Sequence, residues 1–302
     1  MPIGVIGGTG LYKLPGFESV TILDDIVTPW GKPSSPITIA RTPAGTHIAF
    51  LARHGQGHTI PPSQVPARAN IAALRHLGVT TILAFSAVGS LREEIKPRDF
   101  ILPDQIIDRT RGFRPDSFFE QGLVGHIMFA DPFDQDLAAI VERNAHALEG
   151  DAVKIHSKRT REAQKSQTLV CMEGPAFSTR AESHLYRSWD GAIINMSALP
   201  EAKLAMEAEI QYTMVCMATD YDCWKEGEAV CLEMVLSHLQ ANSNNAQNLL
   251  KAVLPDLENE VKSGKIGQKY IGKGRFTVVT NPNNIDPEVK SKFEYLWGSD
   301  AN

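Results

Sequence analysis

The sequence predicts an α/β protein in which helices cover a single sheet. Short apolar runs of strand length alternate with amphipathic segments of helical periodicity along most of the 302 residues. This alternation is typical of an α/β sheet and not of separate helical and all-β parts. Several apolar runs end in a glycine-rich or polar cluster. Because ligands of open α/β sheets bind beyond the carboxyl ends of the strands, we expect the functional residues in these clusters.

The strands are predicted from short runs rich in β-branched and other apolar residues. In chain order they cover residues 3–6, 36–41, 47–52, 80–85, 99–107, 168–172, 192–196 and 212–218. Between them, residues 68–77 have helical periodicity and stop at Gly78, a residue that favours a helix C-terminus. Further helices are expected over residues 137–148, capped by Asp134, over 201–209, after Pro200, and over 228–253.

The domain organisation follows from the absence of a linker or internal repeat before about residue 255. We therefore expect one domain over residues 1–255. Residues 256–302 turn polar, with lysine-rich pieces and the run Asn281-Pro282-Asn283-Asn284. A loosely docked C-terminal extension, ordered in part at most, is expected there.

Composition narrows the functional class. The chain is 43% hydrophobic and 22% charged, with a formal net charge of −5 and dispersed basic residues, which favours a small-molecule partner over nucleic acid or a membrane surface. The four cysteines form no Cys-x-x-Cys pair, so reduced thiols are expected in place of disulfides or zinc. The N-terminus runs into a strand and no apolar stretch reaches membrane-spanning length. These features predict a cytoplasmic location and allow a nuclear pool.

Three strand ends are suited to an oxyanion. Gly7-Gly8-Thr9-Gly10 can direct backbone N–H groups and the Thr9 hydroxyl at an anion, although a tight turn without a ligand is an equal alternative. A dinucleotide fingerprint is excluded because its third glycine is missing. Arg53-His54-Gly55 offers a guanidinium that can bind an anion through two parallel N–H bonds. The run Ser86-Ala87-Val88-Gly89-Ser90 is another small-residue turn.

A metal site built from His54 and His58 is an alternative for the second of these turns. Paired histidines at this spacing bind a metal when a helix aligns them. Gly55 and Gly57 disfavour that helix. No metal is therefore expected.

Asp220 and Asp222 follow the strand predicted at residues 212–218, beside Tyr221 and Trp224. A protonated carboxyl can donate through one oxygen and accept through the other, which complements the acceptor N7 and the donor N6 of adenine. Desolvation would also raise the pKa of such a carboxyl and let it protonate N7. The alternative is a pair of solvated loop aspartates.

Two further strand ends fit around a nucleoside. Phe177, in the run Glu173-Gly174-Pro175-Ala176-Phe177-Ser178, offers an aromatic face to a base, with a core phenylalanine as the alternative. Asn195-Met196-Ser197 offers a thioether for the sugar or base and a hydroxyl for phosphate. Ordinary packing at a strand end explains Met196 equally well.

Together these segments resemble the purine nucleoside phosphorylase family, and within it the branch that acts on methylthioadenosine. The similarity rests on Gly7-Gly8-Thr9-Gly10, Ala52-Arg53-His54-Gly55, Gly89-Ser90-Leu91-Arg92-Glu93-Glu94, Glu173-Gly174-Pro175, Asn195-Met196 and Thr219-Asp220-Tyr221-Asp222-Cys223-Trp224. The order and spacing of these motifs cover residues 3–254.

The resemblance implies a single domain whose mixed sheet curls into a distorted barrel surrounded by helices, and assembly into a homotrimer. It implies inorganic phosphate as co-substrate, with no metal or organic cofactor. Phosphate binding is assigned by resemblance to Thr9, Arg53, His54, Ser86, Ala87 and Ser197. Substrate contacts fall to Met196, Phe177, Asp220, Tyr221 and Asp222, specificity to Ser178 and Leu232, and catalysis to Asp220, while His126 would reach the neighbouring subunit's pocket.

The implied reaction is the reversible phosphorolysis of S-methyl-5′-thioadenosine to adenine and 5-methylthioribose 1-phosphate, in purine and methionine salvage. Ser86 and Ser197 stand where threonine is common in the family, which keeps the hydroxyls. Leu232 stands where valine is common, which leaves the preference among 5′-substituents open. A phosphorylase with another purine nucleoside preference is the first alternative. A histidine phosphatase built on Arg53-His54-Gly55 and a nucleotide-binding regulatory module are alternatives from other classes. Residues 158–167 are left without a role.

Overall fold

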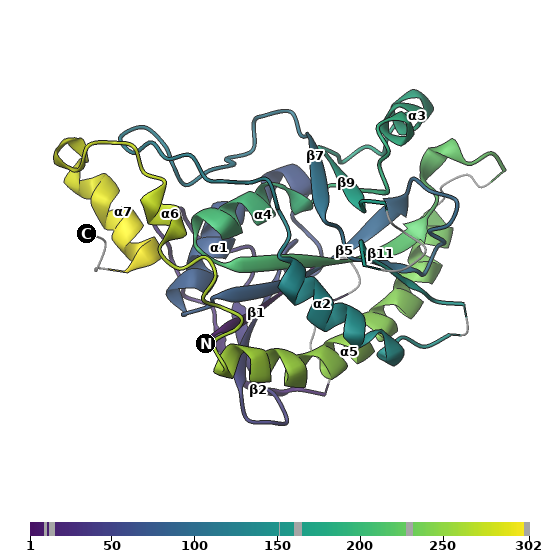
Figure 1. Ribbon diagram of the computed structural model, residues 1–302, viewed down its shortest axis with the longest axis horizontal. Helices are drawn as coiled ribbons and strands as arrows, with labels where there is room; N and C mark the ends of the chain where they lie inside the picture. The colour runs from purple at the N-terminus through teal and green to yellow at the C-terminus, as the bar shows by residue number, and fades with distance from the viewer. Residues whose placement is uncertain (9–10, 12–15, 151, 160–164, 228–231, 299–302) are drawn as a thin grey trace.

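The computed structural model describes residues 1–8, 11, 16–150, 152–159, 165–227 and 232–298, without the side chains of 232–237. Strands and helices alternate along this chain, which confirms the predicted α/β class (Figure 1). The strands are β1 Ile3–Gly7, β2 Glu18–Leu23, β3 Ile37–Arg41, β4 His47–Ala52, β5 Thr81–Ser90, β6 Phe100–Ile101, β7 Gln105–Arg109, β8 Ile155–His156, β9 Thr168–Met172, β10 Ile193–Asn195 and β11 Gln211–Asp220.

The described strands form one mixed sheet that branches at β5. The main path runs β2-β3-β4-β1-β5-β10-β9-β7, while β11 pairs with β5, β6 with β11, and β8 with β6. β5 is the branch point because it pairs in parallel with β1 and β11 and antiparallel with β10. Residues at or just after the ends of β4, β5, β9, β10 and β11 consequently meet around one cavity.

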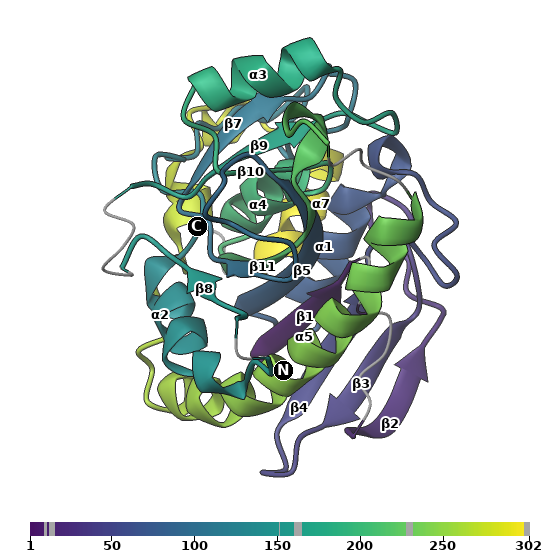
Figure 2. The ribbon, with the colours of Figure 1, turned by 90° about the vertical axis from the view of Figure 1, so that its right-hand side faces the viewer.

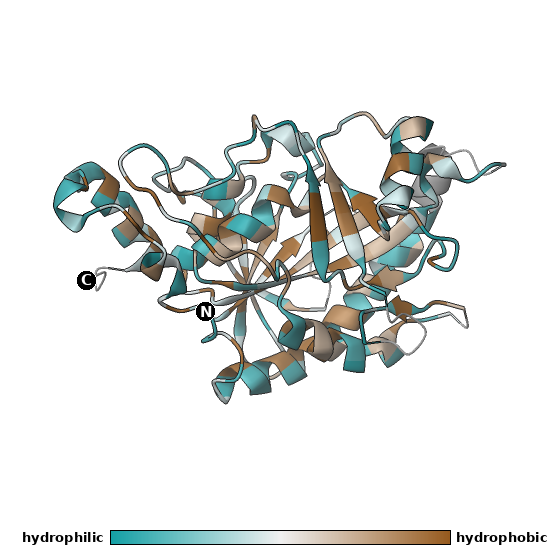
Figure 3. Cartoon of the chain, turned by 45° about the horizontal axis from the view of Figure 1, so that its top comes forward, coloured by the Kyte–Doolittle hydropathy of each residue, from teal (hydrophilic) through white to brown (hydrophobic). Residues whose placement is uncertain are grey.

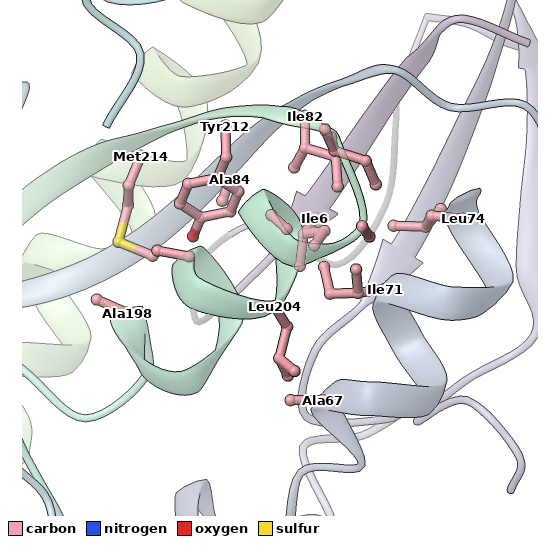
Figure 4. Close-up of a cluster of buried hydrophobic side chains, with 14 of the residues drawn as sticks. Ile6, Ala67, Ile71, Leu74, Ile82, Ala84, Ala198, Leu204, Tyr212 and Met214 are labelled. Carbon is pink, nitrogen blue, oxygen red and sulfur yellow. The ribbon is translucent and has the colours of Figure 1, made fainter. Parts of the chain in front are cut away.

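Burial on both faces explains why the central strands are almost continuously apolar. Along β11, Tyr212 and Met214 pack into one core layer, whereas Val215 and Met217 pack into the layer on the opposite face. Figure 4 shows the first layer, in which α1 and α4 supply the side chains that cover the sheet. Apolar colouring follows the strands in Figure 3 and alternates with polar positions along the helices.

The helices cover both faces of the sheet. In Figure 1, α1 and α4 lie above β5 and β11, and α2 and α5 lie below them; Figure 2 shows α5 running along the sheet beside β1. Their bounds are α1 Ala67–His76, α2 Gln135–Arg143, α3 Arg180–Ser188, α4 Ala198–Glu207, α5 Leu232–Lys262, α6 Lys273–Phe276 and α7 Pro287–Trp297. Asp134 caps α2 as predicted, since its side chain accepts hydrogen bonds from the amides of Asp136 and Leu137. None of the described helices combines the length and apolarity needed to cross a bilayer.

Several elements differ from the sequence-based expectations. The strand predicted over residues 99–107 is two strands, β6 and β7, because Pro103 between them cannot donate to a ladder. β2 was not predicted, although Ser19-Val20-Thr21-Ile22 alternates polar and apolar residues as in a strand; its side chains are largely exposed. α3 was also missed, although Thr179 and Glu182 form a capping box at its start.

The C-terminal segment also differs from the expected loose extension. α5 continues through Pro255 to Lys262, and α7 buries Phe293, Leu296 and Trp297 against the core. The Trp297 indole N–H donates to the carbonyl of Glu207 at 2.9 Å. Leu296 and Trp297 lie three and four residues after Phe293. One face of α7 is therefore apolar, although the segment as a whole is polar. Complete burial of each of these three side chains stabilises the fold by about 1.5–3 kcal/mol.

Candidate active site

A cavity of about 300 Å³ lies at the carboxyl ends of the central strands. It is lined by nine of the predicted site residues, namely Arg53, His54, Ser86, Ala87, Phe177, Met196, Ser197, Asp220 and Asp222. Residues from the ends of five strands, β4, β5, β9, β10 and β11, therefore meet at this cavity, although β10 runs antiparallel to β5. Gly8 packs directly against Arg53, one of these lining residues. A Cβ at this position would collide with Nη1 of Arg53 and the carbonyl of Phe85. Thr9 lies outside the described residues.

Arg53 is held by a buried network that was not foreseen. Its Nε and Nη2 donate to the two carboxylate oxygens of Glu201, both at 2.7 Å, and its Nη1 donates to the carbonyl of Phe85 at 2.8 Å. Tyr212 donates its hydroxyl to Glu201 at 2.7 Å. Burial alone would lower the pKa of Arg53. The charge and hydrogen bonds of the adjacent Glu201 carboxylate together have the larger effect and raise this pKa above its ordinary value.

This network corrects the expectation that the two parallel N–H bonds of Arg53 are free for an anion. Glu201 already occupies that side of the guanidinium. One N–H on each terminal nitrogen of Arg53 is left for a ligand in the cavity. The buried carboxylate fixes the guanidinium before any ligand arrives, which is the preorganisation that an electrostatic binding site needs.

His54 lies beside Arg53 in a neutral state. Its Nδ1 is 2.9 Å from the carbonyl of Ile60, and burial together with the nearby Arg53 charge lowers the His54 pKa to about 4. Its ring centroid lies 4.5 Å from that of His58, with the two ring planes tilted by 34°. Gly55 and Gly57 both have positive φ angles and the segment forms turns. The prediction that no helix aligns the two histidines is therefore confirmed.

Two hydroxyls face each other across the cavity wall. The Oγ atoms of Ser86 and Ser197 are 3.0 Å apart, and the amide of Asn195 donates to them at 3.1 and 3.4 Å. Ser197 precedes α4, yet its hydroxyl makes no capping bond to that helix. Because Asn195 donates to both oxygens, the hydroxyl protons can point at a bound anion. Asn195 stands in a motif named above, but its bridging role depends on a spatial pairing that local sequence does not reveal.

Asp220 and Asp222 are buried, so the alternative of two solvated aspartates is wrong. The pairing of β11 with β5 shifts register between Ala218 and Asp220, and Asp222 has a φ of 51°. One Asp220 oxygen accepts from the Asp222 amide at 2.8 Å and the other from the Thr219 hydroxyl at 2.7 Å. Ser183 donates to Asp222 at 2.6 Å. Burial, the largest cause in each case, raises the pKa of both carboxyls.

Tyr221 is placed differently from the prediction. It lies between the two carboxyls in sequence but is absent from the described lining of the cavity. Its ring meets the ammonium of Lys225 at 3.6 Å and the edge of Trp224, and its hydroxyl donates to the carbonyl of Glu93 at 3.4 Å. The shifted register and the positive φ on either side of Tyr221 direct this side chain to a separate cluster. Direct contact with a substrate is not supported for it.

The other predicted residues divide into two groups. Met196 lines the cavity, and Phe177 lines its rim with 65% of its surface exposed, which excludes the core-phenylalanine alternative. Ser178 is buried behind the wall and donates to the sulfur of Met172. His126 lies on an exposed segment away from this cavity. The side chain of Leu232 lies outside the described residues.

A second buried arginine supports the wall and has no signal in the local sequence. Arg114 donates from Nε to the Glu173 carboxylate at 2.6 Å and from Nη1 to the carbonyls of Met196 and Leu199 at 2.8 and 2.7 Å. Met196 is a lining residue, and Glu173 follows the strand that ends at the lining residue Met172. One guanidinium therefore joins two strand ends of the cavity.

The branched sheet and this cavity, with a fixed guanidinium at one strand end and protonatable carboxyls at another, define the nucleoside phosphorylase class. The chain belongs to the phosphorylase superfamily, whose family model matches residues 2–255. An S-methyl-5′-thioadenosine phosphorylase of Neurospora crassa is 56% identical over 300 residues, covering 98% of this chain and 94% of that protein. One from Yarrowia lipolytica is 56% identical over 296 residues, covering 97% and 91%.

Solved structures give the same result for the fold. A methylthioadenosine phosphorylase from an antarctic soil metagenomic library superposes with a TM-score of 0.85 at 39% identity, covering 97% of this chain and 98% of that one. The methylthioadenosine phosphorylase of Schistosoma mansoni in complex with adenine superposes with a TM-score of 0.79 at 28% identity, covering 99% and 98%.

Proposed function

We infer that the chain catalyses the reversible phosphorolysis of S-methyl-5′-thioadenosine to adenine and 5-methylthioribose 1-phosphate, in purine and methionine salvage. The observation that carries this inference is one cavity that combines a fixed cation and two hydroxyls with two buried carboxyls of raised pKa. The relatives from Neurospora crassa and Yarrowia lipolytica, each 56% identical over nearly the whole chain, carry the name of this activity.

Inorganic phosphate is the co-substrate of this reaction, and no metal or organic cofactor is invoked. Phosphate is a weak nucleophile, so the sugar must gain positive charge as the base leaves. The remaining N–H bonds of Arg53 and the hydroxyls of Ser86 and Ser197 hold the phosphate beside that charge. The bond between C1′ and N9 breaks while a phosphate oxygen bonds to C1′.

The part of the cavity that holds the carboxyl groups of Asp220 and Asp222 acts on the departing adenine. Protonated Asp220 donates to N7, and its proton passes to the base as the glycosidic electrons move onto the ring. Its second oxygen accepts from the 6-amino group, which favours adenine over a 6-oxopurine. Phe177 and Met196, both on the lining, pack against the nucleoside.

Phosphate dependence is the first expected result. Adenine release from S-methyl-5′-thioadenosine, followed chromatographically, should require phosphate and yield one sugar phosphate for each adenine. Equal rates in phosphate-free buffer would show hydrolysis and contradict the proposal. Inosine and guanosine assayed in parallel test the alternative nucleoside preference, and labelled phosphate found on the protein after denaturation at alkaline pH, where a phosphohistidine survives, would favour the histidine phosphatase.

Assembly into a homotrimer is proposed with this function, with His126 reaching the cavity of the neighbouring copy. On the segments next to His126, Met128 and Phe276 are 82% and 92% exposed and Val279 is 64% exposed. An isolated β-bridge between Gly125 and Val278 joins these segments. Clustered exposed apolar side chains mark protein interfaces, and closed symmetry is usual for such assemblies.

Light scattering should therefore give three times the chain mass, and Phe276→Asp should dissociate the assembly because it buries a charge at the interface. Activity per chain should fall with dissociation if His126 completes a neighbouring site. Val27→Asp, at a position 61% exposed elsewhere on the chain, is the matched control. A fully active monomer would contradict the shared site.

A further inference from the structure

The tautomer of His54 is fixed by its surroundings. The carbonyl of Ile60 can only accept a hydrogen bond, so the Nδ1 atom 2.9 Å away must carry the ring proton. The other ring nitrogen, Nε2, has no hydrogen-bond partner within the part of the chain that the structure describes, and the ring lines the cavity. A neutral His54 therefore presents a lone pair, and not a proton, to a ligand.

The charged and titratable groups around His54 keep it in this state. Arg53 precedes it after the end of β4, Arg114 lies on another segment of the wall, and the ring of His58 packs against it at a tilt. Each of these groups disfavours a second proton on His54, as burial does, and the pKa is lowered to about 4. At neutral pH the phosphate end of the cavity thus combines donors, from Arg53 and the two serines, with a histidine nitrogen that can only accept.

We infer that His54 is a specificity residue that selects oxyanions carrying a proton, such as phosphate and arsenate, against fully deprotonated sulfate. This inference rests on the proposed phosphate site. A P–O–H or As–O–H group can donate to Nε2, whereas every sulfate oxygen only accepts, so sulfate sets an acceptor against an acceptor. Arg53 offers only donors to the ligand and cannot make this distinction, because sulfate and phosphate are similar in size and charge. The Ser86 and Ser197 oxygens already accept from the Asn195 amide.

The decisive comparison uses sulfate as a competitive inhibitor against phosphate at about pH 8 and constant ionic strength. His54→Asn is the informative variant, since its amide can still donate to the Ile60 carbonyl but places nothing at Nε2. The ratio of the sulfate Ki to the phosphate KM should fall about tenfold or more in this variant. The corresponding ratio of arsenate to phosphate should stay within about twofold, because arsenate carries the same O–H group.

A second measurement uses the wild-type protein and does not depend on how the variant folds. Calorimetric titration at about pH 5, closer to the pKa of His54, in two buffers of different ionisation enthalpy reports the protons taken up on binding. Sulfate should bind with net proton uptake, because a protonated His54 can donate to it, and phosphate without uptake. No difference between the two anions, or an unchanged Ki-to-KM ratio in His54→Asn, would overturn the inference.

These outcomes separate the inference from the function on which it rests. Adenine release that does not depend on phosphate in the wild-type protein would remove the proposed function. Phosphate-dependent release with equal discrimination in the wild type and His54→Asn would leave the function in place and reject the role of His54.

Discussion

Replacing Arg53 by alanine should lower the free energy of unfolding by about 3–5 kcal/mol, measured by urea denaturation at neutral pH. The side chain is 2% exposed, and its removal leaves the Glu201 carboxylate buried with Tyr212 as its remaining donor among the described residues. Breaking one side of a buried ion pair costs more than the pair itself contributes. Phosphorolysis should be lost as well, because the cavity loses its fixed cation.

Two further variants separate the stability effect from the catalytic effect. Arg53→Met combined with Glu201→Leu removes both charges, so it should recover most of the stability lost in Arg53→Ala while remaining inactive. Arg53→Lys keeps the charge but cannot bind Glu201 bidentately, so its phosphate KM should rise while its nucleoside KM changes little. An Arg53→Ala protein within about 1 kcal/mol of wild type would contradict the buried network.

Asp220→Asn should lower kcat/KM for S-methyl-5′-thioadenosine by about 10²–10⁴-fold, since the acid for N7 is removed. The Asn oxygen can keep the bond from the Asp222 amide that Asp220 now accepts at 2.8 Å. Its NH₂ group then takes the place of the other oxygen and can donate to the O6 of a 6-oxopurine. The ratio of kcat/KM values should consequently move toward methylthioinosine by about 1–3 kcal/mol.

The matched control for this prediction is Asp222→Asn, which alters the neighbouring buried carboxyl. If the ratio moves in Asp222→Asn and not in Asp220→Asn, then Asp222 reads the base. The pH profile gives an independent check. Burial raises the Asp220 pKa, so kcat/KM should fall as the pH rises through that raised pKa, and Asp220→Asn should lose this limb.

The same titration affects stability, with a defined sign. A carboxyl whose pKa is higher in the folded state binds its proton more tightly there. The stability it contributes is complete below the unfolded pKa and declines as the pH rises through the folded pKa. Asp220→Asn should therefore flatten the dependence of the unfolding free energy on pH in that window, relative to the wild type.

Local patterns were sufficient for the class of fold and for residues that do chemistry at strand ends. His54, Ser86, Asp220 and Phe177 each follow an apolar run, and the sheet brings these strand ends together at one cavity. The supporting partners could not be found in this way. Glu201 lies 148 residues from Arg53 in sequence, and the residues around one do not indicate that it pairs with the other.

The direction of side chains was the second feature that could not be predicted from the sequence. The sequence places Tyr221 between two functional carboxyls, yet the register shift in β11 and the positive φ of Asp222 direct its ring elsewhere. A shift of this kind depends on how β11 pairs with β5, which is a tertiary property. The polar C-terminal segment was misjudged for a related reason, because three buried side chains on one face of α7 outweigh its overall composition.

The two ends of the cavity are built by different parts of the chain, and this separation matters for how the protein can evolve. The anion-binding groups come from the ends of β4 and β5 and from the start of α4, whereas the carboxyls come from the end of β11 and the turn after it. Mutations in that last turn can therefore explore new nucleobases while the nucleophile remains phosphate. Directed evolution confined to residues 221–224, with Asp220 kept as the acid, should widen the range of accepted bases at little cost to the shared chemistry.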